Sequence, residues 1–144
     1  MADIDTVLVP IGGGGILAGI ATAIKGMNPK VKVIGVETEN AASMTAALAK
    51  GECCEVCATP TIADGIAVKK VGCKTLELVK KYVDEVVTVS EAEIADAILF
   101  LMERSKVVAE GAGATPVAAI LSGKVDCKGK KTCAVVSGGI LILT

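Results

Sequence analysis

Histidine and aromatic residues are nearly absent from this sequence. Its 144 residues include no histidine, no tryptophan, one phenylalanine and one tyrosine, and the net charge is −1. Nucleic-acid binding favours a basic surface and aromatic side chains on which bases stack, so no nucleic-acid partner is expected. The near-neutral charge gives no attraction to an anionic membrane surface, and no apolar run reaches the roughly 18 residues that a membrane span needs.

A secretory leader is not recognisable either. The segment after Met1 carries Asp3 and Asp5, where a leader would carry basic residues and then an apolar stretch. A cytoplasmic location is therefore the expectation.

The six cysteines do not follow the pattern of a metal site. Cys54 and Cys57 form one Cys-x-x-Cys pair, but a zinc site would need a second pair or histidines. A redox pair is typical of a helix start that follows a strand, whereas this pair lies in a polar, acidic stretch. Ordinary reduced cysteines are the favoured interpretation; a metal site and a redox pair remain alternatives.

The apolar residues that are present are mostly small and aliphatic. They make up 52% of the chain, so the core must be built from Val, Ile, Leu and Ala. This composition is typical of β-branched strands covered by alanine-rich helices. The length fits one domain over residues 1–144.

Four consecutive glycines, Gly12–Gly15, separate a strand pattern from a helical pattern. Glycines fill no core and lose backbone entropy on folding, but a turn made of them exposes several backbone N–H groups. The helix N-terminus that follows adds unpaired donors and a partial positive charge. The segment therefore predicts an anion-binding nest for a phosphate or carboxylate. The alternative is a flexible surface turn.

Strand and helix patterns alternate along the chain. Strands are expected at residues 6–9, 32–38, 85–89 and 132–137, and helices at 15–25, 41–50, 73–82, 91–105 and 115–122. The alternation predicts a mostly parallel sheet with helices on both faces. Glycine-rich loops follow the first and fourth strands, and they can share one pocket only if those strands are neighbours. This predicts a three-layer, Rossmann-like or flavodoxin-like α/β domain whose strands, numbered in chain order, lie in the order 3-2-1-4, with strand three at an edge.

Local signals place individual side chains. Asn40 is expected to cap the second helix, and Pro116 to lie in the first turn of the last helix. Ser90 begins a capping box with the glutamate three residues later. An isoleucine at every fourth position from Ile16 marks one helical face. The lysines, Lys25 among them, are expected to be solvated on helix surfaces or loops.

Five short motifs occur in order along essentially the whole chain. They lie at residues 10–16 (Pro-Ile-Gly-Gly-Gly-Gly-Ile), 35–37 (Gly-Val-Glu), 61–68 (Thr-Ile-Ala-Asp-Gly-Ile-Ala-Val), 107–114 (Val-Val-Ala-Glu-Gly-Ala-Gly-Ala) and 136–139 (Val-Ser-Gly-Gly). This series resembles threonine dehydratase (threonine ammonia-lyase), of the fold-type II pyridoxal-phosphate enzymes that include serine racemase. The glycine motif alone would be weak, whereas five motifs in register are specific.

The resemblance implies a cofactor site. The serine before the late Gly-Gly pair hydrogen-bonds the pyridine nitrogen in that family, which implies this role for Ser137. A neutral hydroxyl leaves the nitrogen largely unprotonated, which suits β-elimination. Glu110 either approaches the cofactor, by analogy, or simply lies near the next helix N-terminus. The tetraglycine loop of the family binds the cofactor phosphate, which implies as donors Gly12, Gly13, Gly14, Gly15 and the N–H group of Ile16.

Some relatives also bind a monovalent or divalent cation. The resemblance implies Glu37 and the carbonyl of Ala41 as its ligands. The third ligand position falls on Ser43, where a carboxylate is expected.

Two parts of the family pattern have no match. The lysine that holds the cofactor covalently lies in a Ser-Phe-Lys segment, and the loop for the substrate carboxylate contains Ser-x-Gly-Asn-His; neither occurs here. After Ser-Gly-Gly, aliphatic residues 140–142 replace Asn-Ile-Asp, and they are expected to extend the last strand or cover exposed core. The chain thus looks like the C-terminal half of the large domain, as an excised or redesigned fragment, with no catalytic residue assigned.

Three functional hypotheses follow. A complete enzyme would deaminate L-threonine or L-serine to the 2-oxo acid and ammonia, and this part alone is expected to be inactive. Alternatively, the chain is a stand-alone phosphate-binding or scaffold module. Third, it is a subunit that needs a complementary N-terminal segment. Apolar surfaces left bare by missing parts would favour a homo-oligomer.

Overall fold

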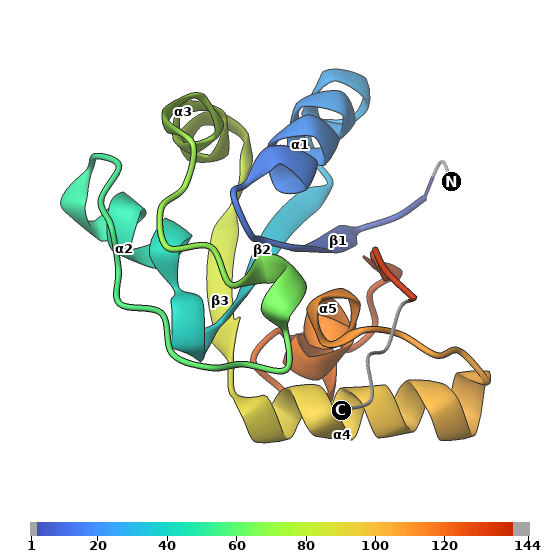
Figure 1. Cartoon of the computed structure of the whole chain (residues 1–144). Helices are drawn as coiled ribbons and strands as arrows, with labels where there is room; N and C mark the ends of the chain where they lie inside the picture. Colours follow the sequence, from blue (N-terminus) through green and yellow to red (C-terminus); the bar gives the residue numbers. More distant parts are fainter. Residues whose placement is uncertain (1–2, 140–144) are drawn as a thin grey trace.

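The computed structural model describes residues 3–139 as four strands alternating with helices (Figure 1). The strands are β1 (Thr6–Pro10), β2 (Lys32–Thr38), β3 (Glu85–Val89) and β4 (Thr132–Ala134). The α-helices are α1 (Gly15–Met27), α2 (Ser43–Lys50), α3 (Cys73–Tyr82), α4 (Glu91–Phe100) and α5 (Gly111–Leu121). Short 3-10 helices η1 (Glu39–Ala41) and η2 (Asp64–Ile66) and a π-helical turn η3 (Leu101–Ser105) complete the elements.

The sheet confirms the predicted order. Its strands lie β3-β2-β1-β4 with every neighbouring pair parallel, so β3 is at an edge as predicted. The fourth strand is shorter than predicted, because it ends at Ala134 and not at Ser137. Past Val135, which still donates to the Leu8 carbonyl at 3.0 Å, the backbone turns to α5, where the Gly138 carbonyl accepts from the Glu110 N–H at 3.2 Å. Residues 140–142, expected to extend the strand, lie outside the described residues.

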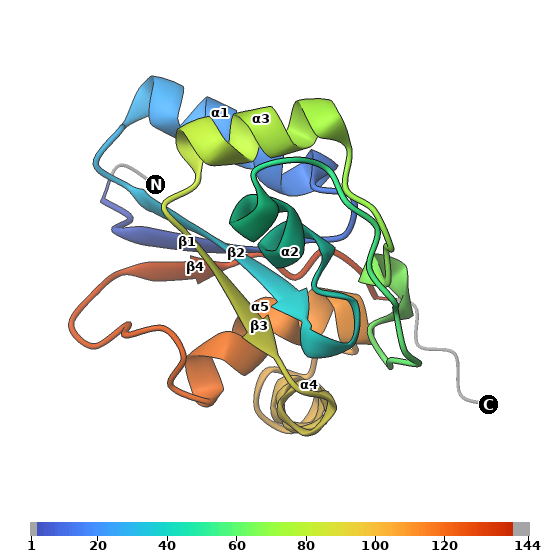
Figure 2. The same ribbon diagram turned by 90° about the vertical axis from the view of Figure 1, so that its left-hand side faces the viewer.

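Helices cover both faces of the sheet and confirm the predicted three layers (Figure 2). Successive β1 side chains point to opposite faces, as a strand requires. On one face α1, α2 and α3 pack over a core that includes Val7, Val9, Leu17, Val33, Met44 and Leu76. On the other, α4 and α5 pack over a core that includes Leu8, Ile34, Val36, Ile94, Ala97 and Ala118. Across the described part of the chain, no helix combines the length and apolar character needed to cross a membrane.

The buried face of α1 differs from the predicted one. Leu17, Ala18 and Ala21 are buried, whereas Ile16 is 55% exposed. Ile16 belongs to the first turn, which lines a pocket instead of covering the sheet. The isoleucine spacing therefore marked only the edge of the buried face.

The last helix begins earlier than predicted. Gly111 already opens α5, so Pro116 lies inside the helix and not in its first turn. The Gly-Ala-Gly-Ala run is helical because small residues allow close packing here: a Cβ on Gly111 would lie 2.1 Å from the Ile62 carbonyl oxygen. By contrast, the capping box at Ser90 is confirmed in both of its hydrogen bonds.

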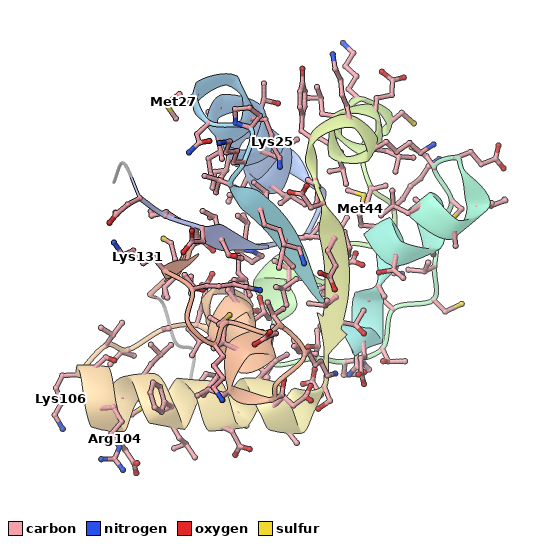
Figure 3. All side chains as sticks on the ribbon, turned by 180° about the vertical axis from the view of Figure 1, so that it is seen from behind. Lys25, Met27, Met44, Arg104, Lys106 and Lys131 are labelled. Atoms are coloured by element: carbon pink, nitrogen blue, oxygen red, sulfur yellow. The ribbon has the colours of Figure 1, made fainter. Side chains whose placement is uncertain are left out.

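Lys25 is not the solvated lysine that was expected. Its side chain is 14% exposed, and its ammonium lies 2.7 Å from the carboxylate of Asp84 (Figure 3). The same carboxylate accepts from the Val33 N–H at 2.7 Å. Partial burial alone would raise the pKa of Asp84, but Lys25 and the Val33 N–H lower it below its usual value.

This pair predicts a loss of stability in acid. Because the folded pKa of Asp84 is depressed, its contribution is complete above about pH 4 and is lost as the pH falls through the folded pKa. We expect Asp84→Asn to cost about 1 kcal/mol at neutral pH, and less at pH 3, by urea unfolding. Glu52→Gln, in the exposed Lys50–Glu52 pair, is the control and should change little. A cost of Asp84→Asn that does not change with pH would contradict the prediction.

Candidate functional site

A pocket of about 300 Å³ opens beyond the carboxyl ends of β1 and β4. Continuing the parallel register of these strands places Ser137 opposite Ile11, next to Gly12. The predicted glycines, Ile16 and Ser137 therefore meet in one place, as the sheet order requires. The lining residues are Pro10, Gly12, Gly13, Gly14, Gly15, Ile16, Gly65, Ile66, Glu110, Ala112 and Ser137.

The tetraglycine turn, Gly12–Gly15, presents bare backbone to this pocket. Gly14 has a φ of 91°, in the left-handed region that favours glycine, and it is the N-cap of α1 without a side-chain cap hydrogen bond. A Cβ added to Gly13 or Gly15 would meet no atom within 4 Å. An oxyanion can thus approach the first-turn amides of α1, where the helix dipole favours negative charge.

The first turn of α3 fixes the orientation of the tetraglycine turn. The carbonyl of Gly13 accepts from the Thr75 hydroxyl at 2.7 Å and from the Gly72 N–H at 3.3 Å. In a trans peptide the C=O and the following N–H point in opposite directions, so the Gly14 N–H is directed away from α3. Sequence reasoning missed Thr75, because nothing local marks a partner 62 positions away.

Thr75→Val should therefore weaken anion binding without unfolding the chain. Valine keeps the shape of threonine but cannot hold the Gly13 carbonyl, so we expect about fivefold weaker binding of inorganic phosphate by calorimetry and a stability loss of about 1 kcal/mol. Thr22→Val is the matched control, since its hydroxyl also donates to a carbonyl at 2.7 Å but within α1. Equal phosphate affinities for the two variants would contradict the role given to Thr75.

A second wall of the pocket comes from the loop between α2 and α3. A Cβ on Gly12 would approach the Cα of Ile66 to 3.2 Å, so the turn and η2 are in close contact. The carboxylate of Glu91 fixes this loop by accepting from the Thr61 hydroxyl at 2.5 Å and the Ile62 N–H at 2.8 Å. Gly65 and Ile66 are lining residues that were not singled out from the sequence.

Ser137 and Glu110 form the third wall. A Cβ on Gly138 would lie 2.1 Å from a carboxylate oxygen of Glu110, and one on Gly113 would lie 3.0 Å from the Gly138 nitrogen. These close approaches hold the Ser-Gly-Gly segment against the start of α5. Glu110 is both the N-cap of α5 and a lining residue, so both alternatives raised for its position hold.

The predicted cation ligands lie apart from the pocket. Glu37 is fully buried and accepts from the Met44 N–H at 2.6 Å and from the Thr45 N–H at 2.9 Å and hydroxyl at 2.7 Å. Burial raises the pKa of Glu37 above its usual value, and these hydrogen bonds oppose that rise. Ala41 is also buried, and the buried Ser43 hydroxyl has no hydrogen-bond partner among the described residues.

Glu37 performs the capping role that was predicted for Asn40. That prediction was wrong: the Asn40 side chain donates to the Pro60 carbonyl at 2.6 Å, and α2 starts later, at Ser43. Within residues 3–139, no group of three His, Cys, Asp or Glu side chains is arranged to hold a metal ion. A cation here would have to use carbonyl and hydroxyl oxygens beside Glu37.

Comparisons with known proteins agree with this geometry. The family model described as "Pyridoxal-phosphate dependent enzyme" matches residues 1–138. The chain is 63% identical to an L-threonine ammonia-lyase of Thermotoga maritima over 139 residues, which are 96% of this chain and 34% of that protein.

Solved structures show the same fold. A threonine deaminase from the organism abbreviated T.th. superposes with a TM-score of 0.88 at 38% identity, over 98% of this chain and 52% of that one. Maize serine racemase superposes with a TM-score of 0.91 at 34% identity, over 99% of this chain and 45% of that one. The chain thus spans about a third to a half of the length of these proteins. It belongs to the family of pyridoxal-phosphate-dependent enzymes.

Proposed function

We propose that this chain is the part of a threonine ammonia-lyase that binds the phosphate and the pyridine ring of pyridoxal phosphate. The observation that carries the proposal is the single pocket that joins the tetraglycine turn to Ser137. The named activity of the Thermotoga maritima relative supports the reaction class. By its coverage of the relatives, the chain corresponds to part of the large cofactor-binding domain.

The residues present fit the cofactor. In this proposal the backbone amides of Gly12, Gly13, Gly14, Gly15 and Ile16 bind the phosphate, which open space beside Gly13 and Gly15 admits. The Ser137 hydroxyl lies at the other side of the pocket and binds the pyridine nitrogen as a neutral partner. When bound, pyridoxal phosphate supplies an electron sink for removing the α-proton and eliminating the β-hydroxyl of an amino acid. The substrates proposed for the complete enzyme are L-threonine and L-serine.

The chain alone is proposed to be inactive. No lysine is among the described residues that line the pocket, so the covalent attachment expected for the family has no donor there. A complementary N-terminal segment would supply it. Exposed apolar side chains on and after α4 offer it, or a second copy in a homo-oligomer, a surface to cover: Leu99, Phe100, Met102, Val107 and Val108. A cytoplasmic location stays a prediction.

A cation site at Glu37, Ala41 and Ser43 stays part of the proposal. The unpartnered Ser43 hydroxyl favours it, and the three hydrogen bonds that Glu37 already accepts oppose it. A rise in thermal midpoint with potassium or magnesium that Glu37→Gln abolishes would support the site. Equal midpoints with and without these cations would exclude it.

A binding titration and an activity assay test the main proposal together. The chain should bind inorganic phosphate and pyridoxal phosphate reversibly, and it should form no 2-oxo acid from L-threonine. Adding the N-terminal segment of the Thermotoga maritima relative should restore deamination. Phosphate binding without restored activity would favour a stand-alone module. A borohydride-stable lysine adduct together with activity in the chain alone would overturn the proposal, as would the absence of phosphate binding.

A further inference from the structure

The loop between α2 and α3 folds back on itself as two antiparallel limbs (Figure 2). The Val56 N–H donates to the Lys69 carbonyl at 2.9 Å, which fixes the limbs relative to each other. The Lys80 ammonium donates to the Gly51 carbonyl at 2.6 Å and closes the open end of the loop against α3. Stepping outward from the Val56–Lys69 pair brings Cys53 opposite the start of α3, where Cys73 is the first residue.

The two thiols meet at that point. The side chains of Cys53 and Cys73 are within hydrogen-bonding reach of each other, and this contact, with burial, raises the pKa of Cys53 above its usual value. Cys73 is exposed, whereas Cys53 is half-buried and packs against the core that contains Val71 and Leu76. An oxidant in solution therefore reaches Cys73 first and finds a second sulfur behind it.

The pair adjoins two walls of the cofactor pocket. The turn of α3 that begins with Cys73 contains Thr75, whose hydroxyl holds the Gly13 carbonyl. The segment that Cys53 and Cys73 enclose contains Gly65 and Ile66, which line the pocket. A bond between the sulfurs would close this segment into a ring and restrain both walls.

We propose that Cys53 and Cys73 are an oxidant-sensitive pair that forms a reversible disulfide beside the cofactor pocket. With a peroxide as oxidant, the Cys73 thiolate attacks the O–O bond and becomes a sulfenic acid, and the peroxide leaves as water after taking up protons. The Cys53 sulfur then displaces the hydroxyl of the sulfenic acid as a second water. The two thiols lose two electrons and two protons, and the peroxide gains them.

This pair is not the one that the sequence pattern favours. Cys54 and Cys57 have Cys-x-x-Cys spacing, but Cys57 is exposed and α3 does not begin beside it in the chain. The contact between Cys53 and Cys73 joins two distant positions and appears only once the loop has folded. A disulfide that closes a loop of this length is expected to stabilise the fold.

Oxidation of the intact chain by hydrogen peroxide tests the proposal. We expect a mass lower by two hydrogens, a Cys53–Cys73 cross-linked peptide, and a thermal midpoint raised by about 5 °C, all reversed by dithiothreitol. Cys53→Ser and Cys73→Ser should each abolish the cross-link and the shift, whereas Cys57→Ser should keep both. A Cys54–Cys57 link, a cross-link between chains, or over-oxidation of Cys73 without a disulfide would overturn it. Peptide mapping of the unsubstituted chain decides the outcome even if a serine variant does not fold.

Discussion

Replacing Gly13 by aspartate should weaken the binding of inorganic phosphate by roughly 100-fold or more, with little change in the free energy of unfolding. The fold accepts the side chain because a Cβ on Gly13 meets no atom within 4 Å and its φ is not positive. The new carboxylate would bind the same amides at the start of α1 that bind the phosphate, and it would repel the incoming anion. Calorimetric titration and urea unfolding measure the two quantities separately.

Two other glycines provide the controls for this result. Gly19→Asp adds the same charge to α1 outside the pocket and should change phosphate affinity less than about twofold. Gly14→Ala should instead destabilise the fold by about 1–3 kcal/mol, because its φ is 91° and the new Cβ would lie 2.8 Å from the Met44 Cε. Unchanged phosphate affinity in Gly13→Asp would show that the anion does not bind at the tetraglycine turn.

Gly111→Ala should be the most destabilising of the glycine-to-alanine changes in helices. Alanine is intrinsically the better helix former by up to about 1 kcal/mol. At this position, however, its Cβ would lie 2.1 Å from the carbonyl oxygen of Ile62, a backbone atom that cannot rotate away. Either α5 or the loop that carries η2 must shift, and we expect a loss of about 2–4 kcal/mol in the free energy of unfolding.

Gly26→Ala is the matched control for that change. Gly26 also lies in a helix, but a Cβ there meets nothing within 4 Å. We expect this variant to be as stable as the unsubstituted chain or up to about 1 kcal/mol more stable in urea unfolding. If Gly111→Ala behaved like Gly26→Ala, the close packing of α5 against the Ile62 segment would be wrong.

Much of the architecture was predictable because it follows from short-range patterns and one topological rule. Alternating strand and helix patterns gave the parallel sheet, and the capping box at Ser90 marked the start of α4. The requirement that two glycine-rich loops share a pocket gave the strand order, since parallel strands bring only their carboxyl ends together.

The misses arise where a distant partner overrides a local preference. Asn40 is a good cap by residue type, but Glu37 reaches the α2 amides from the end of β2 and is itself buried there. The Gly-Ala-Gly-Ala run before Thr115 has weak helix propensity, yet it is helical because only small residues fit against the Ile62 and Gly138 backbones. Likewise, no local pattern could connect Thr75 to Gly13 or Cys53 to Cys73.

Backbone amide resonances during ligand titration test the central claim most directly. With inorganic phosphate, the amides of Gly13, Gly14, Gly15 and Ile16 should shift together and saturate. With pyridoxal phosphate, the Ser137 amide should shift as well, because the pyridine ring reaches the other side of the same pocket. Largest shifts at Asn28, Lys30 and Lys131, which line a separate depression at the opposite end of β1, would contradict the account.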